Sequence, residues 1–226
     1  MDLSVPVLTI DGPSGAGKGA VSARVAAELG WHLLDSGAVY RAVALKVLRE
    51  GVDAADEDAV VALSRGLDLG FRPGVDGIEV LLDGAPVGES LRGEKVSAAA
   101  SRVAALPAVR EAVLDVQQRC RRAPGLVADG RDMGTVVFPD APVKVFLQAS
   151  VEERAKRRYK QLKEKGENVI LSRLFQDMLD RDRRDRERAV SPTVPAPDAI
   201  VIDSTEMSLD AVVEQILGQV RARLRS

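Results

Sequence analysis

The sequence predicts an α/β fold with a P-loop, in which a parallel five-stranded sheet has helices on both faces, a small antiparallel β insert and a helical lid. Three observations support this prediction. Short apolar runs alternate with helical stretches, the pattern of parallel α/β proteins. An Asp-Gly pair separates two apolar runs at residues 83–84, as in β-hairpins. An arginine-rich helical stretch interrupts the alternation between residues 152 and 188.

Five apolar runs are expected to form the parallel sheet. In chain order they are Val5–Ile10, Trp31–Leu34, Gly125–Ala128, Val143–Leu147 and Ala199–Ile202. An aspartate directly follows four of these runs, namely Asp11, Asp35, Asp129 and Asp203. Ligands of open parallel sheets bind at the carboxyl ends of the strands, so these positions predict where the site lies.

The segment after the first run predicts a phosphate-binding loop, because it precedes an Ala/Val-rich helical stretch, Ala20–Leu29. Its glycines let several backbone N–H groups converge, and the helix N-terminus adds partial positive charge. Lys18 adds a cation for the outer phosphates. The expected ATP contacts are Gly12, Pro13, Ser14, Gly15, Ala16, Gly17, Lys18, Gly19 and Ala20. The alternative is a glycine-rich turn without a ligand.

The loop departs from the usual phosphate-loop pattern at one position. A serine or threonine normally follows the lysine, and its hydroxyl binds Mg²⁺. Gly19 takes that place here. Contacts to a metal ion must therefore come from elsewhere or through water, and we expect no direct metal ligand.

Two regions lie outside the alternating pattern. Residues 67–87 predict a small antiparallel sheet, too short to be an independent domain. Residues 152–188 predict two helices divided at Gly166-Glu167-Asn168, and most of their arginines are expected on a solvated, salt-bridged face. Arginines over a phosphate site have the character of a closing lid, to which we assign Arg154, Arg157 and Arg158.

The composition excludes several classes of function. The chain has 226 residues and a net charge of −2, which argues against binding to nucleic acid. Cys120 and His32 are the only residues of their types, so no internal disulfide or multi-histidine metal site is expected. We interpret Cys120 as structural, with a catalytic role as the alternative. Residues 1–4 lack the features of a secretion signal and no run is long enough to span a membrane, so we expect a cytoplasmic protein.

Four motifs together resemble the bacterial cytidylate kinases, a family of nucleoside monophosphate kinases. They are the phosphate-binding loop and the segments Leu34–Arg41, Ala128–Thr135 and Arg181–Arg188, in this order. The resemblance extends from about Val5 to near the C-terminus and includes the β insert. It implies transfer of the γ-phosphoryl group of ATP, with Mg²⁺, to CMP or dCMP. The acceptor phosphate is already an anionic nucleophile, so positioning and charge neutralisation suffice and no general base is needed.

The resemblance also implies roles for single residues. Arg41, Arg131 and Arg188 would bind the acceptor phosphate, and guanidinium groups suit that dianion. Ser101, Arg110 and Asp132 would read the cytosine, whose amino group matches the Asp132 carboxylate, so UMP should be the poorer substrate. Arg181 and Asp185 would hold the ribose. The remaining CMP contacts would be Ser36, Gly37 and Tyr40, and the catalytic cations would be Lys18, Arg131 and Arg188.

Simpler roles remain open for some of these residues. Ser36 could only cap a helix, and Asp132 could only pair with Arg131. Ala20 stands where the family usually has threonine, which puts one phosphate or Mg²⁺-water contact in doubt. We nevertheless predict a functional enzyme.

We predict a single kinase unit with three parts. The core comprises residues 1–35, 104–153 and 189–226, the monophosphate-binding region residues 36–103, and the lid residues 154–188. We expect a monomer whose partners are small molecules. One alternative is a kinase for another acceptor, either AMP or UMP or a small alcohol. An alcohol acceptor would need a general base, which could be Asp11 or Asp35. Another is a nucleotide-binding module without turnover.

Overall fold

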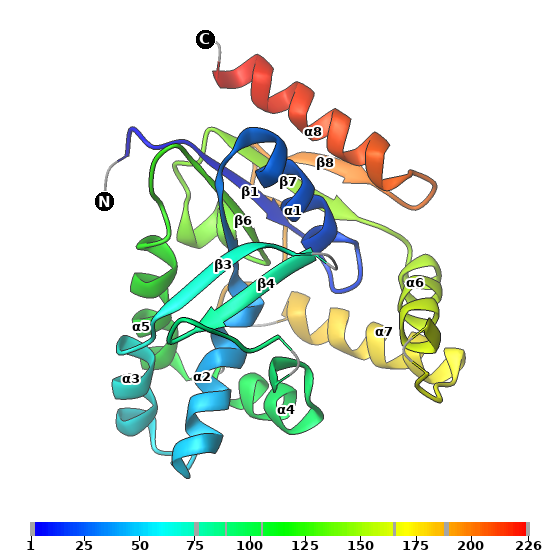
Figure 1. Cartoon of the computed structure of the whole chain (residues 1–226). Coiled ribbons are helices and arrows are strands. Elements are labelled where there is room, and N and C mark those ends of the chain that lie inside the picture. The colour runs from blue at the N-terminus through cyan, green and yellow to red at the C-terminus, as the bar shows by residue number, and fades with distance from the viewer. Residues whose placement is uncertain are drawn as a thin grey trace. The chain divides into compact units, whose positions relative to one another are not determined.

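The computed structural model describes residues 3–74, 77–88, 90–104, 106–164, 166–187 and 190–224. The chain forms two compact units, Met1–Val7 with Ser22–Asp129 and Leu8–Val21 with Gly130–Ser226, which are described in turn. The elements in chain order are β1 (Val7–Asp11), α1 (Lys18–Leu29), β2 (His32–Asp35), α2 (Ser36–Glu50), α3 (Glu57–Arg65), β3 (Leu69–Gly74), β4 (Gly77–Leu82), β5 (Ala85–Pro86), the 3₁₀ turn η1 (Ser90–Arg92), α4 (Glu94–Val103), α5 (Pro107–Gln118), β6 (Leu126–Gly130), the π-helix η2 (Met133–Val137), β7 (Val143–Gln148), α6 (Val151–Glu164), α7 (Leu171–Glu187), β8 (Ile200–Asp203) and α8 (Leu209–Leu224) (Figure 1).

The predicted parallel sheet is confirmed. Its five strands lie in the order β2-β6-β1-β7-β8, and each coincides with one predicted run to within two residues at either end. The strand pairs β2–β6, β1–β7 and β7–β8 run parallel. Strands β1 and β6 are buried along their whole length, which explains why both read as continuous apolar runs rather than as alternating ones.

In the first unit, β3, β4 and β5 form the predicted antiparallel sheet. Asp83 and Gly84 have φ values of 52° and 77° and connect Leu82 to its cross-strand partner Ala85. Positive φ at both central residues is what a two-residue hairpin requires, so the Asp-Gly signal is explained. Helix α2 packs against α3, α4 and α5 of the same unit.

The second unit contains β1, β7 and β8, and helix α8 packs on β7. Its helices α6 and α7 lie side by side (Figure 1). Ser150 caps α6 by accepting a hydrogen bond from Glu153 N. At the other end of α6, Gly166 adopts a φ of 77° and the N–H of Glu167 bonds to the carbonyl of Leu162. The predicted division into two helices is therefore confirmed at Gly166.

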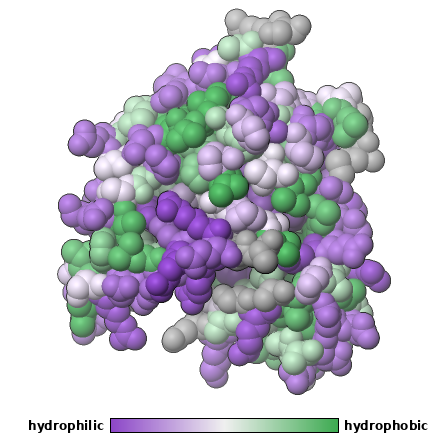
Figure 2. Space-filling view, turned by 180° about the vertical axis from the view of Figure 1, so that it is seen from behind, coloured by the Kyte–Doolittle hydropathy of each residue, from purple (hydrophilic) through white to green (hydrophobic). Residues whose placement is uncertain are grey.

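One face of the molecule shows how polar and apolar residues are distributed on its surface (Figure 2). Hydrophobic residues on the face shown in Figure 2 lie in separate groups between hydrophilic ones. Within the described part of the chain, no helix is both long and apolar enough to cross a bilayer.

Candidate active site

The phosphate-binding loop connects β1 to α1, as the sequence predicts. Gly12 and Gly15 have φ values of 144° and 79°, which residues with side chains rarely adopt. A Cβ atom on Gly12 would lie 2.0 Å from the carbonyl oxygen of Leu147 in β7. The close approach of loop and strand therefore requires glycine at this position.

Lys18 begins α1, and its side chain folds back over the loop. The residue is only 6% exposed, and Nζ donates hydrogen bonds to the carbonyl oxygens of Gly12 at 3.0 Å and Pro13 at 2.9 Å. The backbone of the loop thus positions the cation that the sequence predicts for the phosphates.

Asp11, at the carboxyl end of β1, is buried and holds the start of η2. Its two carboxylate oxygens accept hydrogen bonds from Met133 N and Gly134 N, both at 2.8 Å. Burial and, to a lesser extent, the nearby Asp132 raise the pKa of Asp11, whereas the two N–H groups and Lys18 lower it, and the net result is a pKa of about 7. The sequence predicts that Asp11 lies near the site, at the end of a strand. It does not indicate that both carboxylate oxygens accept hydrogen bonds from backbone N–H groups.

The segment that follows β6 carries Arg131 and Asp132. Nε of Arg131 lies 3.3 Å from a carboxylate oxygen of Asp185 on α7, and Nη1 donates to the carbonyl of Gly130 at 3.2 Å. Asp132 is buried directly before η2. Arg131 thus forms an ion pair with Asp185, which lies 54 positions further along the chain. The sequence could not indicate a partner at this distance.

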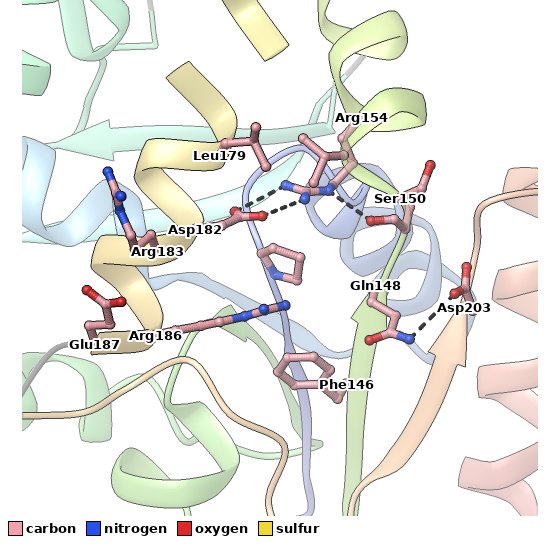
Figure 3. Close-up of a pocket in the computed structure, with 13 residues that line it drawn as sticks. Phe146, Gln148, Ser150, Arg154, Leu179, Asp182, Arg183, Arg186, Glu187 and Asp203 are labelled. Atoms are coloured by element: carbon pink, nitrogen blue, oxygen red, sulfur yellow. Dashed lines mark hydrogen bonds and ion pairs between the residues drawn. The ribbon is translucent and has the colours of Figure 1, made fainter. Parts of the chain in front are cut away.

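A cavity of about 530 Å³ lies between α7, the loop and the carboxyl ends of β7 and β8. Figure 3 shows Arg186 extending from α7 into this cavity beside Phe146, while Arg154 points to Asp182. The cavity wall combines apolar side chains with three arginines and three carboxylates, so a planar ring could pack on the apolar side chains and hydrogen-bond to the charged ones.

The three arginines assigned to the lid differ in their surroundings. Arg154 is 2% exposed and pairs with Asp182. Arg157 pairs with Glu153 and donates to the carbonyl of Ser204 at 2.7 Å. Arg158 is exposed. Arg154 thus does not lie on the solvated face expected for most arginines of this region, and no local pattern indicates its burial.

In the first unit, Asp35 rather than Ser36 caps α2. An oxygen of Asp35 accepts a hydrogen bond from Ala38 N at 2.9 Å, and Ser36 is the buried first residue of the helix. The capping role considered for Ser36 is therefore wrong. The second oxygen of Asp35 pairs with Arg41 at 3.1 Å. A Cβ atom on Gly37 would lie 3.0 Å from Nη1 of Arg41, so the small residue leaves room for this guanidinium group.

The other predicted acceptor residues of this unit lie on helices α2, α4 and α5. The Arg110 guanidinium on α5 lies 5.7 Å from the centre of the Tyr40 ring on α2. Ser101 lies on α4. In the second unit, Arg181 lies exposed on α7, whereas Arg188 is outside the described residues.

Cys120 follows α5 in the first unit. Burial raises the pKa of its thiol to about 11, and Sγ lies 3.6 Å from the carbonyl oxygen of Val116. A thiol with a raised pKa is a poor nucleophile, so these surroundings favour the structural interpretation over catalysis.

Comparisons with known proteins agree with the fold and the motifs. A sequence model of the cytidylate kinase family matches residues 8–222. The cytidylate kinase of Pseudomonas paraeruginosa is 57% identical over 219 residues, which cover 96% of each chain. That of Klebsiella pneumoniae is 54% identical over 224 residues, 99% of each chain. A shikimate kinase from Bacteroides thetaiotaomicron shares the fold, with a TM-score of 0.50 and 11% identity over 96% of this chain and 98% of that one.

Proposed function

This chain belongs to the cytidylate kinase family, and we propose that it transfers the γ-phosphoryl group of ATP to CMP or dCMP, forming ADP and CDP or dCDP. The observation that carries the proposal is the family match over residues 8–222, which includes a phosphate-binding loop whose lysine is held over its own backbone. ATP is accordingly the proposed donor. Lys18 and the amides of the loop would stabilise the negative charge of its phosphates.

The chemistry of the acceptor explains why the site offers cations rather than a base. A nucleoside monophosphate is an anion at neutral pH and attacks without losing a proton. Both oxygens of Asp11 accept hydrogen bonds from backbone N–H groups, and Asp35 caps α2 and pairs with Arg41. Both carboxylates therefore have structural partners, which weighs against an alcohol acceptor that needs a general base.

For the acceptor we propose the roles that the family resemblance implies. Arg41, Arg131 and Arg188 would bind its phosphate, and Lys18, Arg131 and Arg188 would neutralise the transferred charge. The Arg131–Asp185 pair supports this assignment, because the carboxylate restrains the guanidinium group. The proposed contacts to base and sugar are Ser101, Arg110, Asp132, Arg181 and Asp185, with Ser36, Gly37 and Tyr40 beside them.

Magnesium is proposed as the cofactor, carried by the phosphates of ATP. No group of three or more His, Cys, Asp or Glu side chains that could hold a metal ion occurs among the described residues. Gly19 also lacks the usual hydroxyl. Mg²⁺ often keeps several waters and binds mainly through substrate phosphates, so this donor set fits indirect binding. When bound, the ion would neutralise charge on the transferred phosphoryl group.

We further propose a monomeric, cytoplasmic enzyme built from the core, monophosphate-binding region and lid described above. The single cysteine supports a reducing compartment, and the separate hydrophobic groups on the face shown in Figure 2 support a monomer as far as that face is concerned.

One experiment tests the function. Purified protein is incubated with ATP, Mg²⁺ and one acceptor from a panel of CMP, dCMP, UMP, AMP and shikimate, and ADP is monitored. We expect the fastest release of ADP with CMP and dCMP. Release with AMP but not with CMP would contradict the substrate assignment. Binding of ATP without ADP from any acceptor would favour the nucleotide-binding module instead.

A further inference from the structure

Arg154 is the most deeply buried of the charged side chains described above. It lies in the first turn of α6 and is 2% exposed. Its guanidinium group has three partners in three separate segments. Nε donates to the carbonyl of Ala149 at 3.0 Å, Nη1 donates to the carbonyl of Ser14 at 2.8 Å, and both terminal nitrogens contact Asp182 at 3.2 and 2.5 Å. A surface arginine that reaches for phosphate would not be fixed in this way.

The contact to Ser14 bears directly on the phosphate-binding loop. The carbonyl of Ser14 and the N–H of Gly15 belong to one peptide plane and point in opposite directions. Arg154 holds the carbonyl on its own side, so the N–H of Gly15 points away from Arg154. One guanidinium bond thereby fixes the direction of a backbone donor in the loop, and such donors bind phosphate.

Packing on α7 supports the same arrangement. A Cβ atom on Gly15 would lie 3.2 Å from Cε of Met178 and 3.3 Å from Cβ of Arg154. Met178 is buried, and Asp182 lies one turn further along the same helix, with its side chain 11% exposed. The loop thus contacts both an apolar and a charged group from the two helices, and the Asp182 carboxylate compensates the buried charge of Arg154.

We propose that Arg154 is a positioning residue for the donor nucleotide, and that Asp182 holds it in place. The pair sets the orientation of the Ser14–Gly15 peptide, so losing it weakens nucleotide binding at the loop. This role differs from that of a lid arginine that contacts phosphate. The inference rests on the proposed function only in taking a nucleotide as the ligand of the loop.

The test measures the dissociation constant of ADP by calorimetry with no acceptor present. In the double variant Arg154→Met/Asp182→Leu, apolar side chains replace the buried pair, a change that proteins often tolerate. We expect the variant to keep its fold by circular dichroism and thermal unfolding, but to bind ADP at least tenfold more weakly. In turnover assays, KM for ATP should rise by a similar factor, while KM for CMP should change less than about threefold.

The matched control is Asp180→Asn. Asp180 lies on the same helix and pairs with Arg183 at 3.0 Å on the surface, so the control should bind ADP as the wild type does. If the double variant does not fold, Asp182→Asn is measured instead, with at least threefold weaker ADP binding expected.

The other outcomes separate the two proposals. A folded double variant that binds ADP as tightly as the wild type would overturn the positioning role and leave the pair as a packing feature. Equal increases in both KM values would overturn it too. A wild-type protein that binds no ADP would contradict both proposals, whereas ADP binding without turnover of any acceptor would contradict the function alone.

Discussion

The Nε atom of Arg131 lies 3.3 Å from a carboxylate oxygen of Asp185. The two residues come from different parts of the second unit, the segment after β6 and the helix α7. Both side chains are about one-fifth exposed, at 21% and 19%, so solvent screens their attraction only in part. The carboxylate therefore restrains a guanidinium group that we propose for the acceptor phosphate.

Removing the charge of Asp185 should weaken acceptor binding selectively. In Asp185→Asn, we expect KM for CMP to rise about tenfold and KM for ATP to change less than twofold, because Arg131 loses its restraint and the ribose loses the contact that we propose for Asp185. Steady-state kinetics with each substrate varied in turn provides the measurement. Asp177→Asn, an exposed change on the same helix, is the control. Equal effects of the two substitutions would contradict this prediction.

The buried carboxylate of Asp132 should set the preference for cytosine. In Asp132→Asn, the ratio of kcat/KM for CMP to that for UMP should fall about tenfold, because an amide can both donate and accept hydrogen bonds. Parallel assays with the two nucleotides give the ratio. If the ratio stays unchanged, Asp132 takes no part in reading the base.

The missing hydroxyl in the phosphate-binding loop should matter little. Ala20 is exposed on α1, whereas Lys18 is held by two loop carbonyls. We therefore expect Ala20→Thr to change kcat/KM for ATP less than threefold. If the wild-type protein is almost inactive and Ala20→Thr restores its activity, the loop needs this hydroxyl.

Asp11 should make stability depend on pH. Its folded pKa of about 7 exceeds the model-peptide value of 3.8, so between these values the folded state binds a proton that the unfolded state does not. The stabilisation is fully present below about pH 4 and is lost as the pH rises through 7. Urea unfolding at several pH values measures it. We expect the decrease between pH 4 and 7 to be smaller in Asp11→Asn, and an identical pH dependence in the two proteins would contradict this explanation.

Much of the fold could be predicted because its signals are local. Buried strands such as β1 and β6 are continuous apolar runs, and the Asp83-Gly84 turn follows directly from the φ values that these residues tolerate. The phosphate-binding loop is equally local, because its glycines and lysine lie within nine residues. Such features depend only on residues that are close together in the chain, so one amino-acid sequence is enough to predict them.

The contacts that organise the site could not be predicted, because their partners are distant in sequence. Arg154 belongs to a stretch rich in both charges, which is typical of a solvated face, and its partner Asp182 is 28 residues away. Asp11 bonds to N–H groups 122 and 123 residues further along. At α2 only Ser36 was considered as a possible cap from the sequence, and the helix geometry shows that the cap is Asp35.

The fate of the γ-phosphoryl group tests the central claim most directly. Protein is incubated with Mg²⁺, CMP and ATP labelled at the γ-phosphate, and the products are separated by chromatography. We predict that the label appears in CDP in a one-to-one ratio with ADP, and that Lys18→Met reduces this transfer at least a hundredfold. Label released only as inorganic phosphate, or remaining in ATP while CMP is in excess, would contradict the assignment.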